Sequence, residues 1–178
     1  MLTRPSGRSE LSHTDGLRSP ATASCTIAPS SPAARFWSQK DGSQRPTGFW
    51  AEEFVEPHRV LVEAGVDVTI ATPGGRVPVA DEGSLSLQAN RGDAGKVAHL
   101  RDHLKKAAPL LESPKRLEDV DPADYDGVLI PGGHGPMQDL AVNPDVARIL
   151  QTMLPDQSKV VASLCHGRAG FMSVAARA

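Results

Sequence analysis

The chain has 178 residues, of which 39% are apolar and 22% charged, a balance typical of one soluble globular domain. Its formal net charge of −2 gives no electrostatic reason to expect a nucleic-acid partner. No run approaches the roughly 18 consecutive apolar residues of a membrane-spanning helix. Two distant cysteines, Cys25 and Cys165, form neither a disulfide framework nor a zinc-binding pattern, which favours a reduced, cytoplasmic location.

Residues 1–46 differ from the rest of the chain in composition. They contain nine Ser, five Pro, six basic and three acidic residues, whereas residues 47–178 carry 13 basic and 18 acidic residues. Apart from a short apolar run at residues 25–28, this segment shows no helix or strand periodicity, so it has little apolar surface to offset its ordering entropy. We therefore predict a disordered or misassigned segment over 1–46, with an organellar transit peptide as the alternative. One domain over 47–178 should follow.

Beyond residue 46 the apolar residues become periodic. Helical spacing predicts a helix over residues 47–64, which Pro57 should kink or split into two, and Gly65 suits its C-terminal end. An alternating pattern predicts a strand over residues 66–70, and a second helical face predicts a helix over 95–111.

Two uninterrupted apolar runs, residues 127–131 and 159–164, are typical of buried strands. Between them, Asn143 as N-cap and Pro144 in the first turn predict a helix over residues 143–154. Buried strands that alternate with helices indicate an α/β protein with a parallel sheet. In such sheets, ligands bind beyond the carboxyl ends of the strands.

Cys165 and a glycine loop both fall at that edge of the expected sheet. Cys165 directly follows the strand at 159–164, and Pro131-Gly132-Gly133 closes the strand at 127–131. A sharp strand-to-helix turn can push a side chain into a cleft, and a helix that begins there favours the thiolate. The alternative is an unreactive core cysteine, which is common in proteins. The adjacent His166 and the glycine loop favour the reactive interpretation.

Three segments together resemble a known family: Thr47-Gly48-Phe49-Trp50-Ala51-Glu52-Glu53, Pro131-Gly132-Gly133-His134-Gly135-Pro136-Met137 and Leu164-Cys165-His166-Gly167. In this order, over about residues 47–172, the chain is similar to the ThiJ/PfpI family of the class I glutamine amidotransferase-like superfamily. The match is to its heat-shock chaperone and glyoxalase branch. The resemblance implies a flavodoxin-like parallel sheet sandwiched by helices, a nucleophile elbow, and neither a metal nor an organic cofactor.

The resemblance also implies roles for individual residues. Cys165 is the expected nucleophile, Glu53 its acid/base partner, and His166 the histidine that follows the nucleophile, whereas Glu52 is expected to be a solvated neighbour. Backbone N–H groups near Gly133 and His166 are expected to form an oxyanion hole. The expected substrate-binding loop residues are Gly132, Gly133 and His134.

The chain also departs from the family pattern. The family continues after the cysteine with further strands and helices, including an acidic residue that orients the histidine, whereas this chain ends at Ala178. We therefore expect a domain that is truncated at its C-terminus and lacks the third triad residue. Arg168 stands where the family usually has proline.

The implied activity is that of a glutathione-independent glyoxalase. The thiolate of Cys165 would add to a 2-oxoaldehyde such as methylglyoxal, and an enediol step followed by hydrolysis would give a 2-hydroxy acid such as lactate. One alternative is a stress-response holdase chaperone or redox sensor, in which Cys165 is oxidised instead. Another is an inactive truncated fragment. The expected partner is a small aldehyde, and a homodimer is left open because homodimers are common in the family.

Overall fold

The computed structural model describes residues 23–29 and 36–175, and a five-stranded sheet forms their centre. The strand order is β5-β4-β1-β6-β7, and every pairing is parallel, as the sequence predicts. The order reverses between β1 and β6, which is where ligands bind in doubly wound sheets. The strands are β1 (Ser24–Ile27), β4 (Asp67–Thr72), β5 (Lys115–Arg116), β6 (Gly127–Ile130) and β7 (Val160–Ser163).

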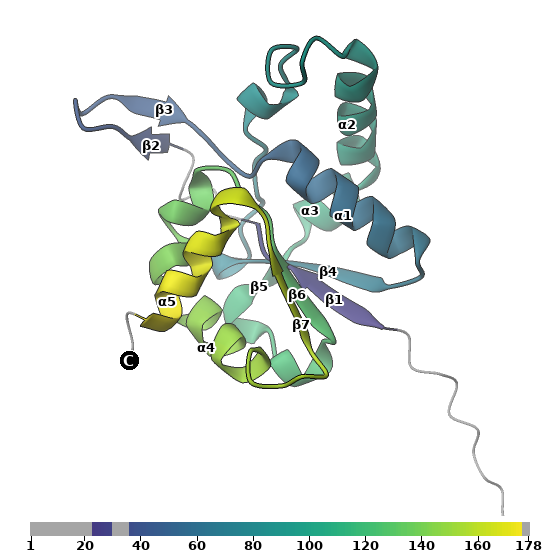
Figure 1. The fold of residues 1–178 in the computed structure, drawn as a ribbon, viewed down its shortest axis with the longest axis vertical. Helices are drawn as coiled ribbons and strands as arrows, with labels where there is room; N and C mark the ends of the chain where they lie inside the picture. The colour runs from purple at the N-terminus through teal and green to yellow at the C-terminus, as the bar shows by residue number, and fades with distance from the viewer. Residues whose placement is uncertain (1–22, 30–35, 176–178) are drawn as a thin grey trace, which may run out of the picture.

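Helices cover the two faces of this sheet (Figure 1). On one face, α1 (Ala51–Glu63) packs against β4, and α2 (Ala94–Lys106) and α3 (Ala108–Glu112) follow beside it. On the other face, α4 (Pro144–Met153) packs against β7 and α5 (Met172–Ala175) against α4. Because both faces are covered, the central strands can be apolar throughout and need not alternate apolar with polar residues. In β6, Leu129 joins the core under α1, whereas Val128 and Ile130 join the core under α4.

The N-terminal part of the sheet corrects the expectation of disorder over 1–46. Residues 24–27 form β1, the central strand, and Ile27 is fully buried (0% exposed). Residues 36–46 form an antiparallel hairpin of β2 (Phe36–Ser38) and β3 (Gln44–Pro46). A buried strand of four residues is too short to show a periodicity, so it is easily missed in a Ser- and Pro-rich segment. Residues 1–22 and 30–35, for which disorder was also expected, lie outside the described residues.

Two helices differ from their predicted form. Helix α1 is one helix, although Pro57 lies inside it and cannot donate a hydrogen bond to the carbonyl of Glu53. Phe54 packs against Phe49 with ring centroids 5.3 Å apart, and His58 Nδ1 lies 2.9 Å from His103 Nε2 of α2, so buried contacts hold the helix together at this point. Gly65, with φ +76°, follows the end of α1 as predicted. The helix expected over residues 95–111 is divided in two, α2 and α3, around Ala107.

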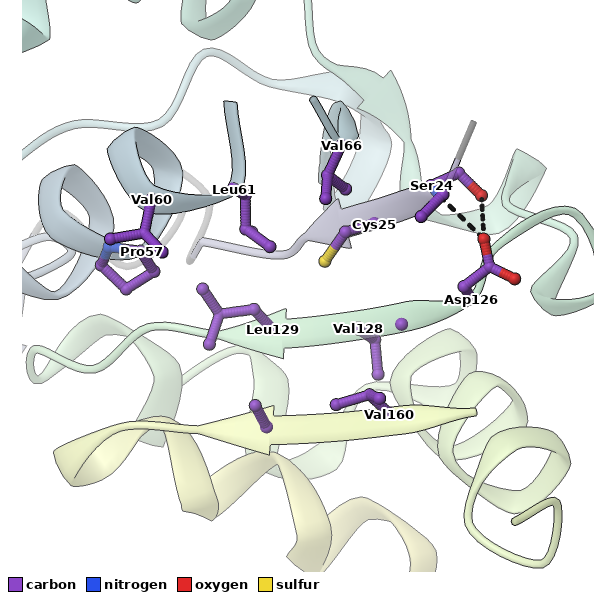
Figure 2. A pocket seen from close by; sticks show the side chains of 13 residues that line it. Ser24, Cys25, Pro57, Val60, Leu61, Val66, Asp126, Val128, Leu129 and Val160 are labelled. Atoms are coloured by element: carbon purple, nitrogen blue, oxygen red, sulfur yellow. Dashed lines mark hydrogen bonds between the residues drawn. The ribbon is translucent and has the colours of Figure 1, made fainter. Parts of the chain in front are cut away.

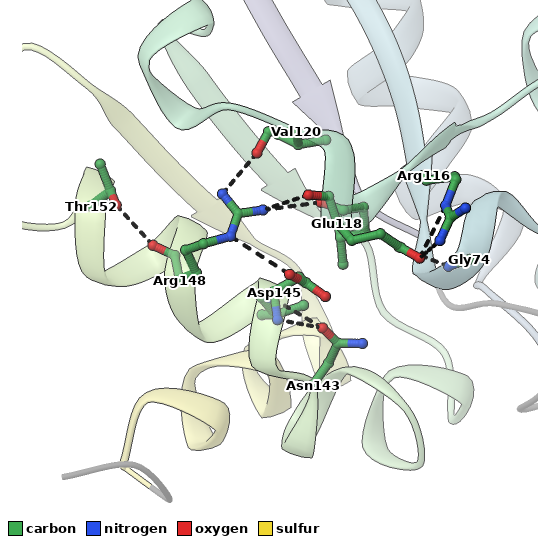
Figure 3. Close-up of polar contacts among 10 residues, drawn as sticks. Gly74, Arg116, Glu118, Val120, Asn143, Asp145, Arg148 and Thr152 are labelled. Carbon is green, nitrogen blue, oxygen red and sulfur yellow. Dashed lines mark hydrogen bonds and ion pairs between the residues drawn. The ribbon is translucent and has the colours of Figure 1, made fainter.

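Helix α4 is anchored by the polar contacts in Figure 3. Asn143 Oδ1 accepts the N–H groups of Asp145 and Val146 at 2.8 and 3.1 Å, which confirms the predicted N-cap. From the middle of the helix, the Arg148 guanidinium donates to the Val120 carbonyl at 2.8 Å. These contacts fix the helix that covers β6 and β7 on one face of the sheet.

The face of the sheet beside α1 carries an open apolar groove of about 360 Å³ next to β6 and β7 (Figure 2). Val60 of α1 and Val160 of β7 border it with 53% and 65% of their surfaces exposed. No helix in the described part of the chain is long and apolar enough to cross a membrane. The other apolar residues at the groove are Ala23, Cys25, Pro57, Leu61, Val66, Val128, Leu129 and Ala162.

Candidate active site

Cys165 lies in a strained turn at the carboxyl edge of the sheet. It opens a 3₁₀ turn, Cys165–Phe171, one residue after the end of β7, and its thiol is exposed. Its φ of +47° places it in the left-handed region that residues with a Cβ rarely adopt. A Cβ on Gly167 would collide with the Ile130 carbonyl, so the chain can turn this sharply only with glycine there. This is the geometry of the nucleophile elbow that the sequence predicts.

His166 lies beside the thiol. Its Nδ1 atom is 3.3 Å from Cys165 Sγ, and its ring stacks on that of His134, with centroids 5.1 Å apart and planes at 29°. Burial lowers the pKa of His134, the charge that His166 carries when protonated and the Arg45 guanidinium lower it further, and the Asp81 carboxylate opposes them. His134 is therefore uncharged at neutral pH.

Glu53 reaches the same place from the first turn of α1. Its Oε2 atom accepts the Gly132 N–H at 2.8 Å, and in return the Trp50 N–H donates to the Gly132 carbonyl at 3.0 Å. A Cβ on Gly132 would fall against Glu53 Oε2 and 2.9 Å from Cys165 Cβ, so the carboxylate and the elbow meet where this glycine has no side chain. Glu52, in contrast, forms an ion pair with Lys96 at 2.5 Å, away from the thiol.

The two glycines of the loop differ in their hydrogen bonds. The Gly132 N–H is donated to Glu53. The substrate-binding role expected of Gly132 stays a prediction. Gly133 has a φ of +100°, and a Cβ there would collide with the backbone of residues 48–50. Within residues 23–29 and 36–175, the Gly133 N–H has no acceptor, so it remains available as an oxyanion donor.

Trp37 is a neighbour of the site residues that the sequence did not indicate. It projects from β2, and its ring centroid lies 5.9 Å from that of His134. The signal that could have located it is the Asp41-Gly42 pair between two short runs, because this dipeptide favours a tight hairpin turn. The composition of the surrounding segment obscured that signal.

The assembled groups suit nucleophilic addition to a carbonyl carbon. A thiol, an adjacent imidazole, a carboxylate and a free backbone N–H are the components of covalent catalysis with oxyanion stabilisation. In the described part of the chain, no group of three or more His, Cys, Asp or Glu side chains is placed to hold a metal ion.

Comparisons with known proteins agree with this geometry. The model of the DJ-1/PfpI family matches residues 46–176. A protein/nucleic acid deglycase HchA of Staphylococcus aureus (strain JH9) is 34% identical over 140 residues, which are 75% of this chain and 45% of that protein. The chain thus spans about half the length of the curated relatives it matches.

Solved structures show the same fold. The crystal structure of glyoxalase III from Candida albicans superposes with a TM-score of 0.66 at 26% identity, covering 84% of this chain and 59% of that chain. Rapid Encystment Protein 24 KDa of Francisella tularensis has a TM-score of 0.67 at 18% identity, over 84% of this chain and 61% of that chain. The chain belongs to the DJ-1/PfpI family.

Proposed function

We propose that the protein is a cysteine enzyme that converts small 2-oxoaldehydes, such as methylglyoxal, into 2-hydroxy acids without glutathione. The observation that carries the proposal is the Cys165 thiol in a left-handed turn, with the His166 imidazole 3.3 Å away and the Glu53 carboxylate held beside it through Gly132. The names of two relatives, a glyoxalase III and a deglycase, support a carbonyl substrate.

In the proposed first step, His166 accepts the thiol proton and Cys165 Sγ adds to the aldehyde carbon of methylglyoxal. The oxygen of that aldehyde becomes an alkoxide, which the Gly133 N–H stabilises before a proton converts it to a hemithioacetal. The Gly133 amide suits this role because nothing else in the described residues accepts its hydrogen bond.

In the second step, a base removes the proton from the former aldehyde carbon, and an enediol forms. Reprotonation at the neighbouring carbon gives the thioester of a 2-hydroxy acid, and water then cleaves the C–S bond to release lactate and the thiol. The net reaction adds one water to methylglyoxal and needs no electron donor or acceptor. We assign the base to Glu53, because its Oε1 atom has no partner in the described residues, whereas Oε2 is bound to Gly132.

The test is turnover of methylglyoxal to lactate by the purified chain and by four variants. Cys165→Ala and Glu53→Gln should lose at least about 100-fold in kcat/KM, since they remove the nucleophile and the base. Two matched controls should stay near wild type: Cys25→Ala, because Cys25 is buried in the core, and Glu52→Gln, because Glu52 pairs with Lys96. Full activity in Cys165→Ala would refute the assignment.

A second candidate function, a holdase chaperone, is favoured by the apolar groove beside α1 (Figure 2). An exposed apolar surface of this kind can bind unfolded segments of other proteins. Val60→Asp places a charge in the groove and should reduce suppression of client aggregation while methylglyoxal turnover persists. If the variant suppresses aggregation as well as wild type does, the groove is not a client-binding surface.

Oxidation of Cys165 without turnover would indicate the redox-sensor alternative. The exposed thiol beside His166 is a candidate for peroxide oxidation to sulfenic acid. Intact-mass measurements after peroxide treatment, combined with the methylglyoxal assay, separate this function from the enzymatic one.

A further inference from the structure

No carboxylate in the described part of the chain forms a hydrogen bond or an ion pair with the His166 side chain. Its only polar partner among residues 23–29 and 36–175 is Cys165 Sγ, and its side chain is exposed. A catalytic imidazole needs a third group that fixes its orientation, because free rotation would turn Nδ1 away from the sulfur for much of the time. Among the described residues, the other contacts of this side chain that an orienting role can rest on are those with aromatic rings.

The ring contacts provide that restraint. His166 stacks on His134 at 5.1 Å and 29°, and His134 in turn packs against Trp37 at 5.9 Å and 49°. We propose that this row of three rings, Trp37–His134–His166, orients the imidazole toward the thiol. Trp37 and His134 are then positioning residues for the proposed function, on which this inference rests.

The rings of Trp37 and His134 are themselves positioned by the backbone. His134 follows Gly133, whose α-carbon is packed so closely against residues 48–50 that no Cβ fits. Trp37 lies opposite Arg45 in the β2–β3 hairpin, and β3 leads through Thr47 directly into the same residues 48–50. Residues 48–50, which we call the strap, thus bring the hairpin and the glycine loop together. The rings of Trp37 and His134 meet as a consequence.

The state of His134 suits this role. Burial is the main cause that lowers the pKa of His134, and the charge of a protonated His166 lowers it further. His134 therefore stays neutral and does not repel a protonated His166. The other charged groups that act on it are Asp81, which raises its pKa, and Arg45 of the hairpin, which lowers it.

The first measurement is the rate of Cys165 alkylation by iodoacetamide between about pH 5 and 9, because it reports the thiol–imidazole pair without any turnover. Cys25 is an internal control, since it is buried and burial raises its pKa to about 11. Trp37→Ala and His134→Ala should slow Cys165 alkylation near pH 6.5 by about 3- to 10-fold, the effect expected from losing one ring contact. Trp37→Phe and His134→Phe keep a ring and should stay within about twofold of wild type.

Phe36→Ala is the matched control, because Phe36 precedes Trp37 on β2 and its side chain projects to the opposite face of the hairpin. It should leave alkylation unchanged. In the methylglyoxal assay, the two Ala variants should lower kcat by the same factor as alkylation, with little change in KM.

Unchanged alkylation in both Ala variants overturns the proposal. A raised KM with normal alkylation in Trp37→Ala also overturns it, because Trp37 would then be a substrate contact. Slower alkylation in the Phe variants as well also overturns it, since a generic loss of packing would then be the cause. If wild type alkylates as expected but does not convert methylglyoxal, the proposed function fails, whereas the ring row stands on the alkylation data alone.

Discussion

Gly132 is a position where a single methyl group should disturb the contact between Glu53 and the elbow. Gly132→Ala places a Cβ against Glu53 Oε2, 2.8 Å from the Leu164 carbonyl oxygen and 2.9 Å from Cys165 Cβ. Ordinary contacts begin near 3.4 Å. The elbow backbone and the carboxylate must therefore move apart by about 0.5 Å or more.

The magnitude follows from which atoms have to move. Two of the three neighbours belong to the backbone or Cβ of the nucleophile turn, which cannot swing away as a long side chain could. Overpacking of this kind costs about 1–3 kcal/mol of folding free energy. A displacement near 1 Å between reacting groups lowers the rate by about 100-fold. We expect Gly132→Ala to fold, with a lower urea midpoint, and to lose about 30- to 100-fold in kcat/KM for methylglyoxal.

The assay compares three chains: wild type, Gly132→Ala and the control Gly95→Ala. Gly95 lies at the exposed start of α2, where a Cβ meets only Asp93 Oδ1 at 3.2 Å, so the control should keep its activity and its stability. Alkylation of Cys165 by iodoacetamide should slow in Gly132→Ala and not in Gly95→Ala. A folded Gly132→Ala chain with activity within twofold of wild type would refute the reasoning, because the carboxylate and the elbow would then not meet at this glycine.

Three further predictions concern stability, each measured by urea unfolding. Ile27→Ala should cost about 2–5 kcal/mol, because Ile27 is fully buried in the central strand; a loss below about 1 kcal/mol would contradict this placement of β1. Asn143→Ala should cost about 1 kcal/mol by removing the N-cap of α4, and Asn143→Ser should restore part of it. His58 and His103 form a pair, and burial is the main cause that lowers the pKa of each. As the pH falls, the unfolded chain therefore takes up protons before the folded one. The free energy of unfolding should therefore fall as the pH drops below about 6.5, and less steeply in His58→Phe; equal slopes would contradict the assignment.

Two parts of the candidate site could be located from local signals in the sequence, whereas the roles expected of Glu53 and His134 came from the family resemblance. Cys165 and the glycine loop come directly after uninterrupted apolar strands, and the topology of a parallel sheet places both at one edge. The same signals indicated β4, β6, β7 and the N-cap at Asn143 correctly.

The remaining features depend on tertiary contacts that a local pattern does not contain. Strand β1 is four residues long and owes its position to pairing with β4 and β6 on both sides. Helix α1 continues through Pro57 because its neighbours bury it, against the local tendency of proline to end a helix. The Gly132 N–H binds a side chain from 79 residues earlier in the chain, so its role could be assigned only from the geometry.

The strap at residues 48–50 explains why these long-range features occur together. The Phe49 N–H donates to the Val79 carbonyl at 3.0 Å and the Trp50 N–H to the Gly132 carbonyl at 3.0 Å, so the strap joins the loop after β4 to the loop after β6. The hairpin with Trp37 precedes it, and the helix with Glu53 follows it. Because one short segment connects the hairpin that carries Trp37 to the helix that carries Glu53 and is bonded to the glycine loop, we expect the two sets of site residues to move together. The composition of the chain before residue 47 hides this dependence, although part of the site is built there.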